Sequence, residues 1–301
     1  MNEISSNILL SSYFQEKFAI KNLLIESKKN EIKNYINFYK NIDNSLQLVL
    51  INQLIKNGKA QINIDLNFDD SGKIKKDYKL SGKVLNAEIK VQKNKILKDL
   101  NFDFLVKDKN YRLEKILFKF HKISFNSEFL NIEKKNKKFH INGNLKNKKN
   151  KINNDIILLF FKENLKIFDF PNTEFETTSE FNFDLSKKFK IKNLKIDTKL
   201  TLDELILKYD SNKIKNYIKN YNNIINLKQN KLYIKYSKEK ILIDGSGKFY
   251  IDENFDNLIN FQIEKRKNKI DFKTLLNLDN IKFTIKDIAY KKLRNQKATL
   301  Q

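Results

Sequence analysis

The chain has 301 residues, and its 60 Lys and Arg residues exceed its 36 Asp and Glu residues to give a formal charge of +24. It contains no Cys and only two His, His121 and His140, which excludes a disulfide framework, a thiolate metal site and a multi-histidine metal centre. With six Gly, it has neither the dinucleotide-binding motif GxGxxG nor a P-loop. Hydrophobic residues make up 40% of the chain, unlike the composition of a disordered protein.

The positive charge is almost entirely lysine, because Arg112, Arg266 and Arg294 are the only arginines. Recognition of phosphates and bases through paired hydrogen bonds favours Arg. We therefore do not expect a nucleic-acid partner, although binding through Lys alone stays open as an alternative. A secondary attraction to anionic lipid head groups is the other use of such a surface.

No segment approaches the roughly 18–20 uninterrupted apolar residues of a transmembrane helix. The longest apolar stretches are Leu46–Ile55 and Ile156–Phe161, and residues 1–20 lack the features of an export signal. We expect either an intracellular chain or a piece of a longer exported protein.

The first periodic segment runs from Lys28 to Lys56, where apolar residues recur at spacings of three and four. This spacing predicts an amphipathic helix within an N-terminal segment of residues 1–57. A second helix is predicted over Asn212–Leu227, as an insertion in the region 58–301. The stretch Ile152–Lys162 is too short for periodicity to distinguish a helix from a buried strand.

From Lys59 onward, apolar and polar residues alternate with a period of two, the pattern of strands with one apolar face. Turn-forming residues such as Asp69–Gly72 separate many short strands. After Val84 the apolar residues change phase, since Leu85, Ala87 and Ile89 come next. Residues 58–301 are predicted to form a long, twisted and curved antiparallel sheet. A loose strand–turn–strand unit recurs along it, often with Gly inside.

Catalytic groups are not evident. The carboxylates lie in turns or on the polar phase of strands, and neither His has a recognisable nucleophile and orienting residue beside it. We expect a protein that is not an enzyme and that needs no cofactor or metal.

An antiparallel sheet with one apolar face must hide that face. A closed sandwich core would do so, and so would a trough that holds lipid acyl chains on a curved apolar sheet. Under the second interpretation, the lipid-binding residues are the bulky members of the apolar phase: Ile62, Ile64, Leu66, Phe102, Phe104, Phe118, Phe120, Phe181, Phe183, Phe249 and Ile251.

The stretch from Ile32 to Val91 resembles the AsmA-like superfamily of Gram-negative bacteria, particularly its YhdP-type central region. In that family an amphipathic segment leads into a strand that begins with Gly, then an acidic-Gly turn and a strand pair. The matching residues here are Gly58, Asp70, Gly72, Tyr78, Leu80, Gly82, Val84, Ala87 and Ile89, with Ala87 in place of a frequent Gly. The weaker resemblance extends over most of residues 28–286.

This resemblance implies an open β-groove of a bridge-like lipid-transfer protein in the periplasm, associated with the inner membrane and extending toward the outer membrane. Phospholipid would be the cargo, and inner-membrane and outer-membrane components the partners. The chain lacks the family's membrane anchor and is much shorter than full-length members. Three alternatives stay open: a structural or scaffold sandwich with a closed core, an outer-membrane β-barrel, and a lysine-rich nucleic-acid binder.

Overall fold

The fold is mainly β, with antiparallel strands and short helices, and this confirms the expected fold class. The computed structural model describes residues 3–8, 10–15, 18–40, 49, 52–92, 95–107, 110–136, 138–152, 168–169, 173–186, 190–210, 212–218, 221–251, 256–267 and 269–301. Contacts divide the chain into unit 1, residues 1–145 and 182–192, and unit 2, residues 146–181 and 193–301.

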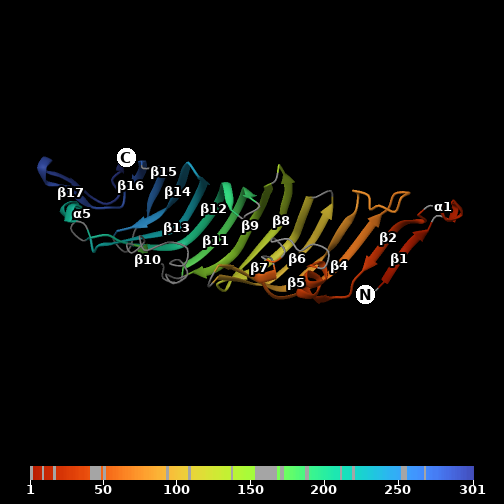
Figure 1. Cartoon of the computed structure of the whole chain (residues 1–301). Coiled ribbons are helices and arrows are strands. Elements are labelled where there is room, and N and C mark those ends of the chain that lie inside the picture. Colours follow the sequence, from red (N-terminus) through yellow and green to blue (C-terminus); the bar gives the residue numbers. More distant parts are fainter. Residues whose placement is uncertain are drawn as a thin grey trace. The chain divides into compact units, whose positions relative to one another are not determined.

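Unit 1 is an antiparallel sheet in which the strands β1, β2, β4, β5, β6, β7 and β8 pair one after another (Figure 1). The short strand β3 also pairs with β4. The elements are β1 (Glu3–Ile8), α1 (Leu10–Phe14), β2 (Ile20–Glu26), β3 (Asn30–Glu31), α2 (Ile32–Lys40), β4 (Ile55–Asn67), β5 (Lys79–Gln92), β6 (Lys95–Lys107), β7 (Asn110–Phe120), β8 (Ile123–Lys135) and β9 (Lys138–Ile152). The strand β9 continues into unit 2.

Bulges bend the sheet of unit 1. The register shifts between Val84 and Ala87 in β5, and further shifts occur in the pairing of β6 with β7. Asn86, Asp99 and Lys115 take positive φ angles of 50°, 52° and 52° on three successive strands. A bulge inserts one residue and increases the local twist. The shift in β5 confirms the change of apolar phase predicted after Val84.

The core of unit 1 lies on the apolar face. Ala87, Leu100 and Ile116 are buried there, and Ile32 of α2 packs against this cluster. A Cβ atom added at Gly58 would lie 2.7 Å from Ala87 and 2.9 Å from the Ile32 side chain. The close approach of α2 to the sheet therefore requires Gly at this position.

The strands of unit 2 belong to the same antiparallel sheet, and in this unit β12, β13, β14, β15 and β16 pair in chain order (Figure 1). Its elements are β10 (Phe168–Asp169), β11 (Thr173–Ser186), β12 (Ile191–Lys208), α5 (Asn212–Tyr217), β13 (Ile224–Ser237), β14 (Lys240–Tyr250), β15 (Asn257–Arg266), β16 (Lys269–Asn277), β17 (Phe283–Ile285), η1 (Lys286–Ile288), β18 (Tyr290–Lys292) and β19 (Thr299–Leu300). The strands β11 and β12 have residues in both units.

A small C-terminal substructure comes after β16, where β17 and β18 form a hairpin. Lys292 is 1% exposed and donates hydrogen bonds to the carbonyl oxygens of Asp279, Ile281 and Leu293 at 2.8, 3.1 and 3.0 Å. Burial lowers the pKa of Lys292. This lysine joins the segment 279–281 to its own strand end, so its role in the fold is structural.

Both predicted helices are shorter than expected. The first was predicted over 28–56, but Asn30–Glu31 and the residues from Ile55 onward are strands, and most of 41–51 lies outside the described residues. In the second, the helix ends at Tyr217 and β13 begins at Ile224, because Ile225 and Leu227 pair with residues of β12 in a β ladder.

The ambiguous stretch 152–162 lies almost entirely outside the described residues. Strands β1–β3 precede residue 57 and pair with one another or with β4. None of the helices in the described ranges has the length and hydrophobicity to cross a membrane.

Candidate functional site

The apolar face of unit 1 is built from rows of cross-strand partners, which lie side by side on one face of a sheet. One row joins Ile4, Ile25, Ile64, Leu80, Val106 and Tyr111 on six successive strands. The next row, here named the Gly82 row, consists of Ile62, Gly82, Phe104 and Leu113. The alternation in the sequence therefore produces one continuous apolar surface from β1 to β7.

Gly82 has a specific packing role in its row. A Cβ atom added there would lie 2.1 Å from the backbone oxygen of Gln61 and 2.8 Å from the Phe104 ring. The absence of a side chain lets the ring of Phe104 lie against the strand. Phe104 in turn forms an edge-to-face pair with Phe102, with the ring centroids 6.4 Å apart.

The apolar face of unit 2, on β12–β16, repeats this arrangement. The Gly245 row consists of Leu232, Gly245, Phe261 and Thr274, with Leu200 beside Leu232 on β12. The neighbouring row joins Thr198, Ile234, Ile243, Ile263 and Phe272. Thus the Gly245 row has an aliphatic residue, Gly and Phe on β13, β14 and β15, in the same order as the Gly82 row on β4, β5 and β6. The residues on the fourth strands, Thr274 and Leu113, differ.

The ring of Phe261 lies against Gly245. A Cβ atom added at Gly245 would lie 2.1 Å from Cζ of this ring. At Gly245 the atoms nearest to such an added Cβ belong to a side chain, whereas at Gly82 the nearest atom is a backbone oxygen. Each unit therefore has one glycine covered by a phenylalanine from the next strand.

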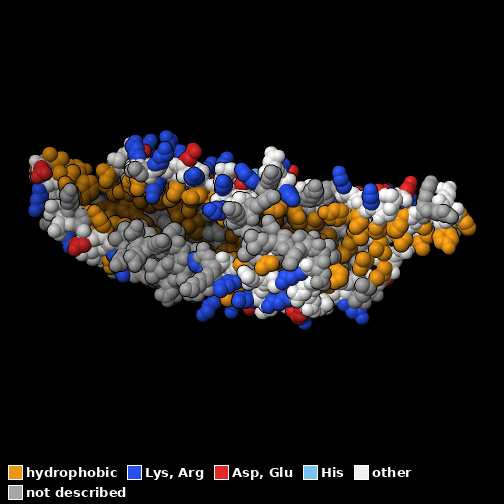
Figure 2. Space-filling view, in the orientation of Figure 1, with side chains coloured by type: hydrophobic (Ala, Val, Ile, Leu, Met, Phe, Trp, Pro, Cys, Tyr) orange, Lys and Arg blue, Asp and Glu red, His pale blue; other side chains and the backbone are white. Residues whose placement is uncertain are grey.

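The apolar face of unit 2 is accessible. Among the described residues of the whole chain, 12 hydrophobic residues are buried, while 24 large hydrophobic residues are exposed. None of Ile234, Ile243 and Ile263 is among the buried ones. On β16 the exposure reaches 63% for Ile270 and 60% for Phe272. Figure 2 shows the hydrophobic side chains gathered over β12–β16, with Lys and Arg side chains along the border of this region.

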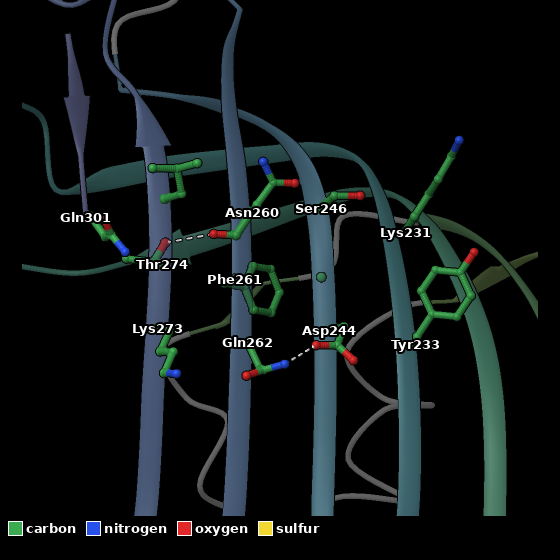
Figure 3. A pocket seen from close by; sticks show the side chains of 12 residues that line it. Lys231, Tyr233, Asp244, Ser246, Asn260, Phe261, Gln262, Lys273, Thr274 and Gln301 are labelled. Carbon is green, nitrogen blue, oxygen red and sulfur yellow. Dashed lines mark hydrogen bonds between the residues drawn. The ribbon is translucent and has the colours of Figure 1, made fainter.

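The opposite face of β13–β16 is polar. Gln262 donates a hydrogen bond of 2.7 Å to Asp244, and Lys231, Tyr233 and Lys273 lie on the same face (Figure 3). Together with Gly245, Phe261 and Leu275, these residues line a hollow of about 510 Å³. Lys199 lies 6.0 Å from the centroid of the Tyr233 ring. The two faces of unit 2 thus differ in chemistry as the alternation predicts.

The predicted lipid-binding residues fall into several groups. Ile62, Ile64, Leu66, Phe102 and Phe104 are brought together on the apolar face of unit 1, where all are half-buried. Two of them also have partners on β2, since Leu66 pairs with Leu23 and Ile64 with Ile25.

Of the remaining predicted residues, Phe118 packs against the same buried cluster of Ala87, Leu100 and Ile116 as Phe102, and its ring stacks on Phe125 with the ring centroids 5.4 Å apart. Phe120 pairs with Ile123. Phe181 and Phe183 are half-buried on β11. In unit 2, Phe249 is 3% exposed and belongs to the interior. Ile251 lies beyond the end of β14 and lines a cavity of about 300 Å³ with Ile218, Ile281 and Phe283.

Sequence reasoning missed the most accessible part of this surface, Ile270 and Phe272 on β16, although they alternate with Lys269, Asp271 and Lys273. It also missed the pentapeptide IKNYI, which occurs twice, at 32–36 and 214–218. Each copy lies in or next to a short helix that precedes a four-strand group, α2 before β4 and α5 before β13. A search for identical short segments would have found it.

The titratable groups form local structural pairs. A hydrogen bond to Asp256 at 2.6 Å raises the pKa of Tyr250 to about 12. Hydrogen bonds from Ser71 and Lys73 lower the pKa of Asp69 in the predicted turn. His140 lies 3.1 Å from Asp184. In the part of the chain that the structure describes, no cluster of three or more His, Cys, Asp or Glu residues could hold a metal ion.

Comparisons with protein-family models, with curated proteins and with solved structures give no match for this chain. The functional interpretation therefore depends on the two faces of the sheet.

Proposed function

We propose that this chain is a lipid-binding protein of the lipid-transfer type, which holds phospholipid acyl chains on the apolar faces of its sheets. The observation that carries the proposal is the accessibility of the apolar face of unit 2. Ile234, Ile243 and Ile263 stand side by side on three strands and are half-buried, and their row ends at Phe272, which is 60% exposed. An accessible apolar surface of this extent is typical of a binding site.

The physical basis is the removal of apolar surface from water. At about 25 cal/mol per Å² of buried apolar surface, one acyl chain gains several kcal/mol on such a face. Rows of aliphatic and aromatic side chains that repeat from strand to strand offer nearly equivalent positions. A lipid held in this way can move along the face without a large barrier, and no catalytic group is needed.

A place in the cell envelope, in the periplasm and next to the inner membrane, belongs to the same proposal. It derives from the resemblance of residues 32–91 to the AsmA-like superfamily. Membrane components that deliver or receive phospholipid would then be the partners.

The first test is whether the purified chain carries phospholipid. Mass spectrometry of an organic extract of the purified protein should detect phospholipid. The variant Phe272→Glu should carry less, because it places a carboxylate on the most exposed strand of the apolar face while the 60% exposure of Phe272 leaves room for the change.

The matched control is Lys273→Glu, which introduces the same side chain at the next residue of β16 and on the opposite face. It should retain the lipid. Lipid-free wild-type protein would refute the proposal and favour a scaffold with a closed core. Equal loss of lipid in the two variants would show that the apolar face is not the binding surface.

A further inference from the structure

One lysine lies on the apolar face of unit 2. Lys265 of β15 stands between Ile241 of β14 and Ile270 of β16, in a row that continues to Tyr236 of β13 and Ile196 of β12. Lysine at such a position keeps its methylene groups on the apolar surface and its ammonium group in water. This row lies at the end of the strands where the β13–β14 and β15–β16 hairpins turn.

The same end of unit 2 carries an excess of positive charge. Six cationic residues, Lys238, Lys240, Lys265, Arg266, Lys267 and Lys269, accompany three acidic residues, Glu239, Glu264 and Asp271. Lys240 and Lys269 lie 3.0 Å from Glu264 and Asp271, respectively, and Arg266 also pairs with Glu264.

These pairs occupy Glu264 and Asp271, and Lys265 makes no ion pair with any described residue. The hairpin lysines Lys238 and Lys267 are likewise without an ion pair within the described ranges. Their positive charge is available to a ligand. At the other end of β14, by contrast, Asp256 accepts hydrogen bonds from both Lys248 and Tyr250.

We propose that Lys265 and the two hairpin lysines bind the phosphate of an anionic phospholipid whose acyl chains lie on the apolar face of unit 2. This inference rests on the proposed function and names the head-group class. The Lys265 ammonium group is the one positive charge within the apolar rows of β13–β16, so it lies where an acyl chain on Ile263 or Ile243 would join its head group. The Tyr236 side chain, 37% exposed in the same row, offers a hydroxyl donor.

The test is a capture experiment with delipidated full-length chain. The chain is incubated with vesicles that contain equal amounts of phosphatidylcholine and phosphatidylglycerol, separated from them, and its bound lipids are quantified by mass spectrometry. One lysine near an anionic lipid contributes about 1 kcal/mol, which corresponds to a factor of about five, so wild-type protein should hold phosphatidylglycerol in at least about fivefold excess. The variant Lys265→Leu should lower this excess about fivefold and retain its total bound lipid.

Lys273→Leu is the matched control, because it removes a lysine from the opposite face of the adjacent strand, and it should keep the preference (Figure 3). Equal capture of the two lipids by the wild-type chain would overturn the inference and leave the proposed function standing. An unchanged preference in Lys265→Leu would also overturn it. Capture of neither lipid would contradict the proposed function and, with it, this inference.

Discussion

The four-strand groups β4–β7 in unit 1 and β13–β16 in unit 2 are built alike but bury their apolar faces differently. In both, a Gly on the second strand pairs with a Phe on the third, at Gly82–Phe104 and Gly245–Phe261. In unit 1 the apolar face continues into the cluster around Leu100, which α2 helps to cover. In unit 2 the equivalent rows on β13–β15 are half-buried, as they are in unit 1, and the difference lies on β16, where Ile270 and Phe272 are 63% and 60% exposed. The same alternation can therefore produce a partly covered core or an apolar face that ends on an exposed strand.

The short helices α2 and α5 also pack differently in the two units. In unit 1, α2 packs on β3 and β4, Ile36 is 8% exposed, and Tyr35 donates hydrogen bonds to Ser27 and to the Lys28 carbonyl at 2.7 and 2.8 Å. The identical pentapeptide of α5 lies against β17 instead, and Tyr217 is 48% exposed. Identical local sequence therefore packs according to its neighbours.

The largest expected effect is a truncation in the covered face. Leu100→Ala removes a buried side chain from the cluster of unit 1, and we expect it to lower the free energy of unfolding by about 2–5 kcal/mol. Ile243→Ala, on the accessible face, should cost less than half as much because water already reaches that side chain. Urea denaturation followed by circular dichroism measures both. Equal losses would mean that the two faces are covered to the same extent.

The two glycines offer the next contrast. Gly82→Ala forces a Cβ atom against the Gln61 carbonyl oxygen, so the strands must separate, and we expect a loss of about 1–3 kcal/mol. Gly245→Ala meets only the Phe261 ring, which can turn away, so its cost should stay below about 1 kcal/mol. Thermal unfolding of the two variants would test this order, and the reverse order would contradict the packing described for the two rows.

A smaller effect distinguishes the two helices. Tyr35→Phe removes a hydroxyl that makes two hydrogen bonds, and we expect a loss of about 1 kcal/mol. The equivalent change Tyr217→Phe, at an exposed site, should stay within about 0.5 kcal/mol. Calorimetry of the two variants would measure both losses of unfolding free energy. Equal losses would contradict the different packing of α2 and α5.

The smallest expected effect is the response of unit 2 to alkaline pH. The folded state holds Tyr250 neutral because its pKa is about 12, above the value near 10 of the unfolded chain. Its contribution to stability is therefore complete below about pH 10 and is lost as the pH rises from about 10 to 12. The melting temperature of the wild type should fall more steeply over this range than that of Tyr250→Phe. Parallel curves would show that the hydrogen bond to Asp256 contributes nothing.

Much of the fold could be predicted from local pattern. The alternation from Lys59 onward predicted the strands, the turn at Asp69–Gly72 and the phase shift after Val84. The helix predicted over 212–227 was wrong beyond Tyr217, because Ile224, Ile225 and Leu227 fit helical spacing yet pair in a β ladder. Short apolar segments of this kind satisfy both periods, and the partner strand decides.

The candidate site could be predicted only in part. The sequence indicated the apolar phase, and five of the eleven predicted residues come together on β4 and β6. Phe249 alternates like the others but is buried, while Ile270 and Phe272 are the more accessible residues. Whether an apolar residue is covered depends on which distant segments pack over it, and period-two alternation does not contain that information.

Photo-crosslinking tests the central claim most directly. A phospholipid with a photoreactive group at the end of an acyl chain is bound to the wild-type protein, irradiated, and the modified residues are mapped by mass spectrometry. Adducts should concentrate on the apolar phase of β14–β16, at Ile243, Ile263 and Phe272. Adducts mainly on the polar phase, at Asp244, Gln262 and Lys273, or no adducts on these strands, would contradict the account.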